Sequence, residues 1–290
     1  MTNVIQSIIS GLGAGAIYVA VALGFSIVYK SARVVNFAHG QYLVVGGILA
    51  TILIKDFNWA LPIVILLALV VGVALGVGTE IVVFRVLKKP DHLVMTLGTV
   101  AVGLIIETAI LIPTDGGLYS LNEFPGPRFS IASVTVSSQL LWNLLIAITA
   151  TLVLQYFFHR TRRGITLQAA ADDRTTASIF GISTGSTTLW SFGIAGALGA
   201  LAGIMYTPLS PMTFSIGLVI GLKGFAAAML GGLGSMKGAL VGGLIIGLLE
   251  GFTATYTNSF ISGLIPFITL LLVLLFKPSG IFKEVAVERV

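Results

Sequence analysis

Residues 60–86 read ALPIVILLALVVGVALGVGTEIVVFRV, a stretch whose only charged side chains are Glu80 and Arg85. A transmembrane α-helix needs about 20 apolar residues to cross about 30 Å of hydrocarbon, so this stretch predicts a membrane-spanning helix. Similar apolar stretches occupy residues 5–29, 36–54, 93–113, 140–158, 186–208, 216–234, 236–252 and 262–276. We therefore expect an all-α polytopic membrane protein with eight or nine transmembrane segments. The segment 216–234 contains Lys223, which favours a broken or re-entrant helix there.

The composition of the whole chain is that of a protein embedded in lipid. Of its 290 residues, 56% are apolar and only 9% are charged, whereas soluble domains carry about 25% charged residues. The 35 glycines and 9 prolines are scattered through the apolar stretches. Transmembrane helices tolerate both residues, and here they indicate close packing and broken helices. We interpret residues 1–290 as a single transmembrane domain.

The basic residues indicate the orientation of the chain. If the N-terminus lies outside and the chain alternates through nine segments, only Lys55 and Arg128 fall outside, and Lys223 lies within a segment. The other basic residues then fall in the cytoplasm: Lys30, Arg33, Arg85, Lys88, Lys89, Arg160, Arg162, Arg163, Arg174, Lys237, Lys277, Lys283 and Arg289. This bias follows the positive-inside rule and predicts an outer N-terminus and a cytoplasmic C-terminus. It explains the net positive charge without a nucleic-acid partner.

The first segment and the two longest connections have distinct features. Because no Lys or Arg precedes residue 30, we expect a retained first span rather than a cleaved signal peptide. Residues 114–139 lie outside in this topology, where they either meet a periplasmic partner or cap the bundle. Residues 160–186 lie inside, and the stretch 167–180 predicts a short helix, with Gly164 and Gly181 suited to its start and its left-handed cap.

Small side chains on this short helix would let another protein surface approach closely. Ala169 and Ala177 are such side chains. The alternative is an amphipathic helix that rests on the bilayer surface. The residues alone favour neither interpretation.

Four ionisable residues lie within the apolar segments: Glu80, Glu107, Lys223 and Glu250. An ionised side chain in hydrocarbon costs about 2.5–3.5 kcal/mol on insertion scales, so each needs a partner, a cavity or the membrane interface. We expect Glu80 and Glu250 to lie near segment ends, in contact with water. Glu107 and Lys223 are deeper, and we predict that they pair with each other or flank a translocation path. A purely structural ion pair is an equal alternative.

The second segment opens with the motif Asn36-Phe-Ala-His-Gly40. Asn36 suits a helix N-cap because its side-chain oxygen can accept a hydrogen bond from a backbone N–H. Histidine changes charge near neutral pH, but no second ligand lies near His39 in the sequence, so a packed or hydrogen-bonded histidine is the simpler interpretation. Glycine pairs four residues apart, such as Gly72 with Gly76 and Gly243 with Gly247, permit close helix contact.

No motif predicts catalysis, metal binding or nucleotide binding. The cluster Gly231-Gly-Leu-Gly-Ser-Met-Lys-Gly238 lacks the Gly-Lys-Ser/Thr order of a phosphate-binding loop. Three histidines (His39, His92 and His159) and no cysteine give no hydrolase or metal constellation. The sequence therefore favours transport, with no metal and no cofactor bound by this chain.

Four stretches, in order along the chain, resemble the permease subunits of ABC importers of the branched-chain amino acid class (LivH-type). They are GLGAGAIYVAVALG (Gly11–Gly24), NFAHG (Asn36–Gly40), LKGFAAAMLGGLGS (Leu222–Ser235) and KPSGIF (Lys277–Phe282). The connection 160–186 is similar to the cytoplasmic coupling loop of that family, through Gly164, Ala169, Asp172, Asp173, Ala177, Gly181 and Ile182. In one departure, Gln168 stands where the family usually has arginine.

This resemblance implies partners and a path. In that family, two permease subunits, identical or homologous, form a dimer in the bacterial inner membrane. Two cytoplasmic ATPase subunits bind the coupling loops and use the ATP, and a periplasmic binding protein delivers the substrate. Substrate would pass near breaks in helices, for which the stretch from Gly11 to Gly15 and residues 217–234 are candidates. Candidates to line the path are Tyr18, Asn36, His39, Glu107, Lys223 and Phe225, although packing is the simpler interpretation of the aromatic rings of Tyr18 and Phe225.

Other functions stay open from the sequence. A permease for urea, short amides, a sugar or another small polar solute would carry the same motifs if the binding protein sets selectivity. A stand-alone channel or carrier would need no ATPase, and would conduct solute when reconstituted alone. A purely structural membrane subunit would tolerate disruption of residues 160–186.

Overall fold

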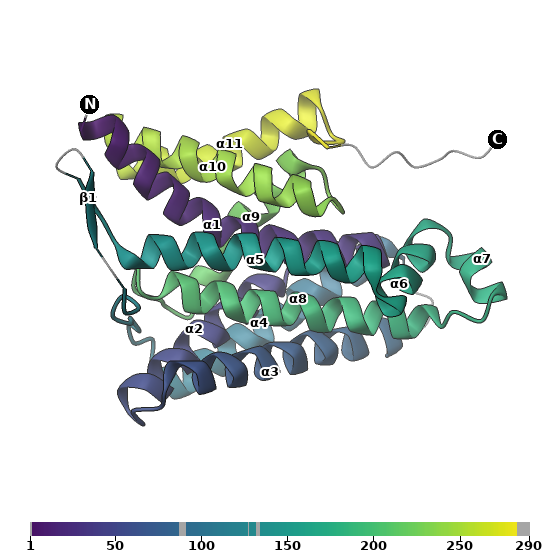
Figure 1. Cartoon of the computed structure of the whole chain (residues 1–290). Coiled ribbons are helices and arrows are strands. Elements are labelled where there is room, and N and C mark those ends of the chain that lie inside the picture. The colour runs from purple at the N-terminus through teal and green to yellow at the C-terminus, as the bar shows by residue number, and fades with distance from the viewer. Residues whose placement is uncertain (1, 87–90, 127, 132–133, 283–290) are drawn as a thin grey trace.

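The computed structural model describes residues 2–86, 91–126, 128–131 and 134–282. These residues form eleven α-helices, one π-helical turn and one two-stranded hairpin (Figure 1). In chain order they are α1 (Thr2–Ala32), α2 (His39–Lys55), α3 (Leu61–Glu80), the π-helical turn η1 (Ile81–Arg85), α4 (His92–Thr114), β1 (Phe129–Ile131), β2 (Val134–Val136), α5 (Ser138–Arg160), α6 (Arg162–Asp172), α7 (Arg174–Ile179), α8 (Thr184–Tyr206), α9 (Ile216–Gly231), α10 (Met236–Tyr256) and α11 (Ser259–Phe276). Lys88, Lys89, Lys283 and Arg289 lie outside the described residues.

The apolar helices match the nine predicted segments one to one. Among the described residues, seven helices are long and apolar enough to cross a membrane, and α2 and α9 are shorter apolar helices. α2 has 17 residues and α9 has 16, which at 1.5 Å per residue gives about 25 Å, less than the hydrocarbon thickness of about 30 Å. The predicted helical membrane fold is confirmed, and within the described residues the small hairpin of β1 and β2 departs from an all-α chain.

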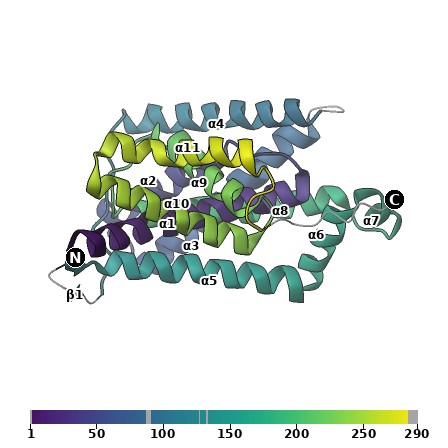
Figure 2. The same ribbon diagram turned by 90° about the horizontal axis from the view of Figure 1, so that it is seen from above.

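The helices pack side by side in an elongated bundle. The N-terminus and the hairpin lie at one end, and α6 and α7 project from the other end (Figure 1). Seen from above, α4 and α5 lie along opposite edges of the bundle (Figure 2). On α4, only Thr99, Gly103 and Ile110 are buried, so most of its apolar surface faces outward.

Helix α1 forms the centre of the bundle. It is continuous over 31 residues, so the predicted break in the stretch from Gly11 to Gly15 is wrong. An added Cβ at Gly11 or Gly15 would lie 2.8 Å from the carbonyl oxygen of Gly247 or 3.0 Å from that of Gly243, both in α10. These glycines therefore permit backbone contact between two helices instead of bending one helix.

Close contact at glycines also joins α8 to its neighbours, as the four-residue spacing predicts. An added Cβ at Gly72 or Gly76 of α3 would collide with the backbone of Gly196 or Phe192 in α8. At Gly203 of α8 it would collide with the carbonyl oxygen of a residue in α2. Because no side chain separates these backbones, the contacts between α2, α3 and α8 are tight.

The helices α2 and α9 begin inside the bundle. After α1 the chain turns at Arg33, where φ is +56°, and His39 then lies against Gly24, well before the end of α1. An added Cβ at Gly40, near the start of α2, would collide with the carbonyl oxygen of Gly217, near the start of α9. The interruptions of the helical path are therefore the stretches before α2 and α9, where the two N-termini meet.

The connection at residues 114–139 packs on its own chain over much of its described length. Tyr119 and Met212 form an isolated antiparallel bridge, and the backbone N–H of Leu121 donates to the carbonyl of Thr207 at 3.2 Å. Leu121 and Phe124 are buried. Of the two interpretations from the sequence, these contacts support capping of the bundle.

Candidate functional site

Helices α6 and α7 form an arm, residues 161–183, that projects beyond the bundle (Figures 1 and 2). The hydroxyl of Thr161 caps α6 by accepting from the N–H of Gly164 at 3.0 Å. Gly164 is buried where α6 turns against α5, and an added Cβ would collide with the carbonyl oxygen of Phe157. A close contact that only glycine permits therefore holds the arm against α5.

The arm contains two helices where the sequence predicted one over residues 167–180. Asp172 ends α6, and Asp173 is extended between α6 and α7. The carboxylate of Asp173 accepts from the backbone N–H of Thr176 at 3.0 Å and also from the Thr176 hydroxyl. Capping of α7 by Asp173 therefore competes with continuation of α6 and divides the predicted helix.

The predicted left-handed cap at Gly181 is confirmed. Its φ is +78°, its N–H donates to the carbonyl of Ser178, and the N–H of Ile182 donates to the carbonyl of Ala177, both at 3.0 Å. This pair of bonds is a Schellman motif. A residue with a Cβ would be strained at Gly181.

Exposure in the arm differs from the expected face of small residues. Ala169 is exposed, but Ala177 is buried at 4% relative exposure. The large apolar side chains that are exposed on the arm are Ile165, Ile179 and Phe180, and the last two have relative exposures of 78% and 80%. Sequence reasoning missed Ile179 and Phe180, although two large apolar residues directly before a capping glycine were a visible signal.

The second group of candidate residues lies inside the bundle, on α1, α9 and α10. The ammonium of Lys223 donates to Oε1 of Glu250 at 2.5 Å, and the hydroxyl of Tyr18 donates to Oε2 at 2.5 Å. The Lys223 and Glu250 side chains are only 11% and 14% exposed. The predicted pairing of Lys223 with Glu107 is therefore wrong, and Glu250 is held by partners rather than placed at a wet segment end.

Glu107 is bound to a different residue. Its Oε2 accepts from Nε2 of Gln41 in α2 at 2.9 Å. The other side-chain atom of Gln41, Oε1, is buried without a hydrogen-bond partner among the described residues, as are both ring nitrogens of His39. These polar atoms lie at the start of α2. Gln41 Oε1 is next to Gly217 of α9, whereas the His39 ring lies against Gly24 of α1 and Gly199 of α8. The meeting point of the two short helices thus has unused hydrogen-bonding capacity.

Asn36 fixes the entry to α2. Its Oδ1 accepts from the N–H of Ala38 at 3.1 Å, but Ala38 is itself the N-cap of α2 and no side chain caps the helix. The predicted N-cap at Asn36 is therefore wrong, and the Asn36 side chain instead holds the turn that precedes the helix. Its Nδ2 donates to the hydroxyl of Tyr42 at 3.2 Å, and that hydroxyl donates to Oγ1 of Thr79 at 2.7 Å. This buried chain of bonds joins the start of α2 to α3.

Aromatic packing surrounds this entry. The His39 ring packs edge-on against Phe25 at 5.1 Å and against Tyr42 at 5.8 Å between centroids, which confirms a packed histidine. Phe225 contacts Phe25 at 5.5 Å and Phe37 at 6.0 Å. Phe225 therefore has the packing role that the sequence favoured.

Glu80 is buried, which contradicts the expectation of a wet position. Its Oε2 accepts from Nε of Arg85 at 3.2 Å, and its Oε1 accepts from the hydroxyl of Thr188 at 2.9 Å. The carboxylate is 2% exposed. It lies where α3 passes into the π-helical turn, so it joins that turn to α8.

The comparisons with known proteins address the whole chain. Residues 7–274 match the family described as the branched-chain amino acid transport system permease component. The chain belongs to this permease family. The high-affinity branched-chain amino acid transport system permease protein BraD of Pseudomonas aeruginosa is 29% identical to this chain. The similarity covers 99% of this chain and 98% of BraD.

Two further relatives agree. LivH of Escherichia coli K12, a high-affinity branched-chain amino acid permease protein, is 30% identical over 99% of this chain and 97% of its own length. A probable branched-chain amino acid permease protein, LivH of Methanocaldococcus jannaschii, is 29% identical over 76% of this chain and 72% of its own. The permease is thus a multi-pass inner-membrane protein and an ABC transporter subunit.

In the part of the permease that the structure describes, no three His, Asp or Glu side chains are placed to hold a metal ion. The candidate residues instead form two groups. One is the projecting arm. The other is the interior around the starts of α2 and α9, with the cluster of Tyr18, Lys223 and Glu250 beside it.

Proposed function

We propose that this permease is the membrane-spanning subunit of an importer for branched-chain amino acids, driven by separate ATPase subunits that bind the α6–α7 arm. The permease would pair with a second, identical or homologous, permease subunit and receive substrate from a periplasmic binding protein. It would bind no cofactor, and the partner ATPases would use the ATP. The family description and the names of the relatives support the substrate class.

The observation that carries the proposal is the exposed apolar pair Ile179 and Phe180 on the arm. Large apolar side chains exposed together mark interaction sites. The pair belongs to α7 and its cap, and α7 lies at the far tip of the arm (Figure 1). That position favours contact with a cytoplasmic protein over contact with the bilayer surface.

The test is Phe180→Asp in cells that express the complete transporter. Full burial of a Phe side chain contributes about 1.5–3 kcal/mol, so we expect at least a tenfold weaker association of the ATPase subunits with tagged permease, and loss of leucine uptake. Phe57→Asp is the matched control, because Phe57 is 62% exposed and lies between α2 and α3. Retention of the ATPases by Phe180→Asp would contradict the proposal.

The proposed orientation places the N-terminus outside and the arm in the cytoplasm. Because the chain has no cysteine, single cysteines report on orientation without background. We expect a membrane-impermeant thiol reagent to label Phe57→Cys in intact cells and to label Ile179→Cys only after the membrane is opened. The reverse pattern would contradict the proposed topology.

The meeting point of α2 and α9 is the proposed part of the translocation path. Helix N-termini carry partial positive charge, and discontinuous helices present such ends to anionic substrate groups. The start of α2 is surrounded by Asn36, His39 and Glu107, the last of which is hydrogen-bonded to Gln41 of α2. Phe225 packs beside this start. Tyr18 and Lys223 lie in the adjoining cluster.

A permease for urea, short amides or another small polar solute is the alternative. Binding measured on the cognate periplasmic protein distinguishes the two: affinity for leucine, isoleucine or valine supports the branched-chain proposal, and affinity for an amide supports the alternative. Flux through vesicles that contain only this permease would instead indicate a channel or carrier.

A further inference from the structure

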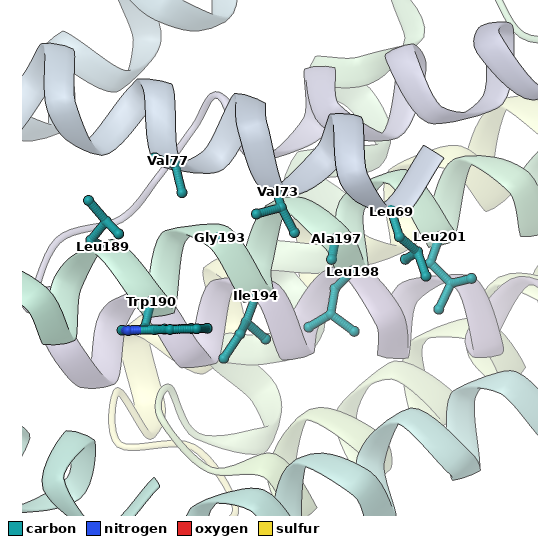
Figure 3. Close-up of a pocket in the computed structure, with 10 residues that line it drawn as sticks. All are labelled: Leu69, Val73, Val77, Leu189, Trp190, Gly193, Ile194, Ala197, Leu198 and Leu201. Carbon is teal, nitrogen blue, oxygen red and sulfur yellow. The ribbon is translucent and has the colours of Figure 1, made fainter. Parts of the chain in front are cut away.

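An apolar groove runs between α3 and α8 on the outside of the bundle. It has a volume of about 380 Å³. Figure 3 shows Leu69, Val73 and Val77 of α3 facing a row of α8 side chains that runs from Trp190 to Leu201. All of its lining surface is apolar, so hydrocarbon, and not water or a polar solute, is the occupant that fits.

A second, more polar cavity of about 380 Å³ adjoins the groove at Trp190, which lines both. Arg163, Gly181, Ser183 and Ser186 are among its lining residues, and they come from the arm and the first turn of α8. An apolar cavity and a polar cavity thus lie on either side of one shared side chain, Trp190.

The polar part is suited to an anion. The guanidinium carbon of Arg163 lies 4.7 Å from the centroid of the Trp190 ring, and within the described ranges Arg163 forms no ion pair. Ser183 and Ser186, at the N-terminus of α8, also line this cavity, and a helix N-terminus carries partial positive charge. Ser183 caps this helix. Two sources of positive potential thus flank a cavity with no acidic side chain in its lining.

The dimensions match one leaflet of a bilayer. From Trp190 to Leu201 the helix rises about 16 Å at 1.5 Å per residue, and half of a hydrocarbon core of about 30 Å is about 15 Å. Trp is enriched at the level of the headgroups, and basic pockets on the cytoplasmic side bind anionic headgroups. The groove and the polar cavity therefore have the depth and the chemistry of a lipid's tail and headgroup.

We propose that this site binds one anionic phospholipid of the inner leaflet, with an acyl chain in the α3–α8 groove and its phosphate beside Arg163. The leaflet assignment rests on the orientation proposed above. An apolar helix of a second protein would fill the groove but would leave the polar cavity empty and Arg163 without an anionic partner. The headgroup would contact Gly181 and Ser183, so the lipid would steady the arm at its return to α8.

The binding test uses the purified full-length permease, stripped of lipid in detergent and titrated with phosphatidylglycerol or phosphatidylcholine under native mass spectrometry. One basic residue near an anionic surface changes binding by about fivefold. We expect phosphatidylglycerol to bind more tightly at one site, and Arg163→Gln to remove about that factor. Arg160→Gln, which removes the same charge from an exposed position outside the cavity lining, should bind like the wild type.

A second pair of variants tests the groove. An added Cβ at Gly193 meets only side chains of Val73 and Val77, at 3.4–3.5 Å, so Gly193→Leu should project into the groove and weaken both lipids. Gly263→Leu is the control, because nothing lies within 4 Å of a Cβ there. Glycerol phosphate should bind far more weakly than phosphatidylglycerol.

Three outcomes would overturn the proposal. If Arg163→Gln and Arg160→Gln changed lipid binding equally, the assignment of the headgroup site to Arg163 would be contradicted. Unchanged lipid binding in Gly193→Leu would remove the acyl-chain site. A change in oligomeric state in Gly193→Leu, with lipid binding retained, would assign the groove to a second copy of the chain. None of these readouts depends on transport, so they are independent of the proposed substrate.

Discussion

Breaking the internal ion pair should cost far more than removing it whole. Lys223→Met leaves the Glu250 carboxylate with only the Tyr18 hydroxyl, and Glu250→Leu leaves the Lys223 ammonium beside that same hydroxyl, at 3.4 Å. The side chains are nearly buried, at 11% and 14% exposure. Each single variant therefore places an uncompensated charge between α1, α9 and α10.

The magnitude follows from the geometry of the pair. At 2.5 Å and an effective dielectric constant near 20, the attraction is about 7 kcal/mol, and the cost of desolvating both charges offsets much of it. Removal of one partner of a buried pair typically destabilises a protein by about 3–5 kcal/mol. We expect Lys223→Met to be the milder change, because Tyr18 still donates to Glu250. The double variant should lose only about 1–3 kcal/mol, the cost of the unsatisfied Tyr18 hydroxyl.

Equilibrium unfolding of the purified permease in mixed micelles would give these free energies. The charge exchange Lys223→Glu with Glu250→Lys should recover much of the lost stability. The exchange Lys223→Glu with Glu107→Lys should recover none, because Glu107 binds Gln41. Losses that simply add in the double variant, or rescue by the exchange at Glu107, would refute this assignment of partners.

Three further perturbations test the packing. Gly164→Leu should release the arm from α5 and abolish pull-down of the ATPase subunits while membrane insertion, measured by fractionation, is unchanged. In Gly247→Leu the new side chain should collide with the backbone of α1 and lower the free energy of unfolding by several kcal/mol, the upper end of the range for overpacked cores. Gly263→Leu is the control and should change the free energy of unfolding little. Tyr42→Phe should lose about 1–3 kcal/mol of stability in unfolding measurements, because Thr79 and the amide of Asn36 lose a buried partner.

The positions of the membrane helices were predictable because the bilayer sets their length. An apolar stretch such as residues 60–86 has few structures open to it in lipid, since every backbone polar group must be satisfied internally. The breaks were not predictable, because glycine serves two purposes. In α1 the glycines permit contact with α10, while the actual interruption before α2, at residues 33–38, contains no glycine.

The partners of the buried charges could not be chosen from the sequence. The buried ammonium of Lys223 needs an anionic partner, but the sequence offers three carboxylates within apolar segments, those of Glu80, Glu107 and Glu250. The bond from Thr188 to Glu80 joins residues 108 positions apart, and no local pattern reports such a distance. In the arm the reverse holds: Asp173 followed by Thr176 is a local capping signal, and attention to it would have divided the predicted helix.

Helix α8 connects the two candidate regions. It begins at the return of the arm, packs closely on α2 and α3 through glycines, and ends one residue before Thr207. The stretch that follows leads directly into α9. It includes Met212, whose sulfur would be 2.5 Å from a Cβ added at Gly47 of α2. Close-packed interiors transmit strain rather than absorb it. A displacement of the arm by bound ATPases would therefore reach the stretch before α9, and with it the meeting point of the two short helices, through one continuous helix.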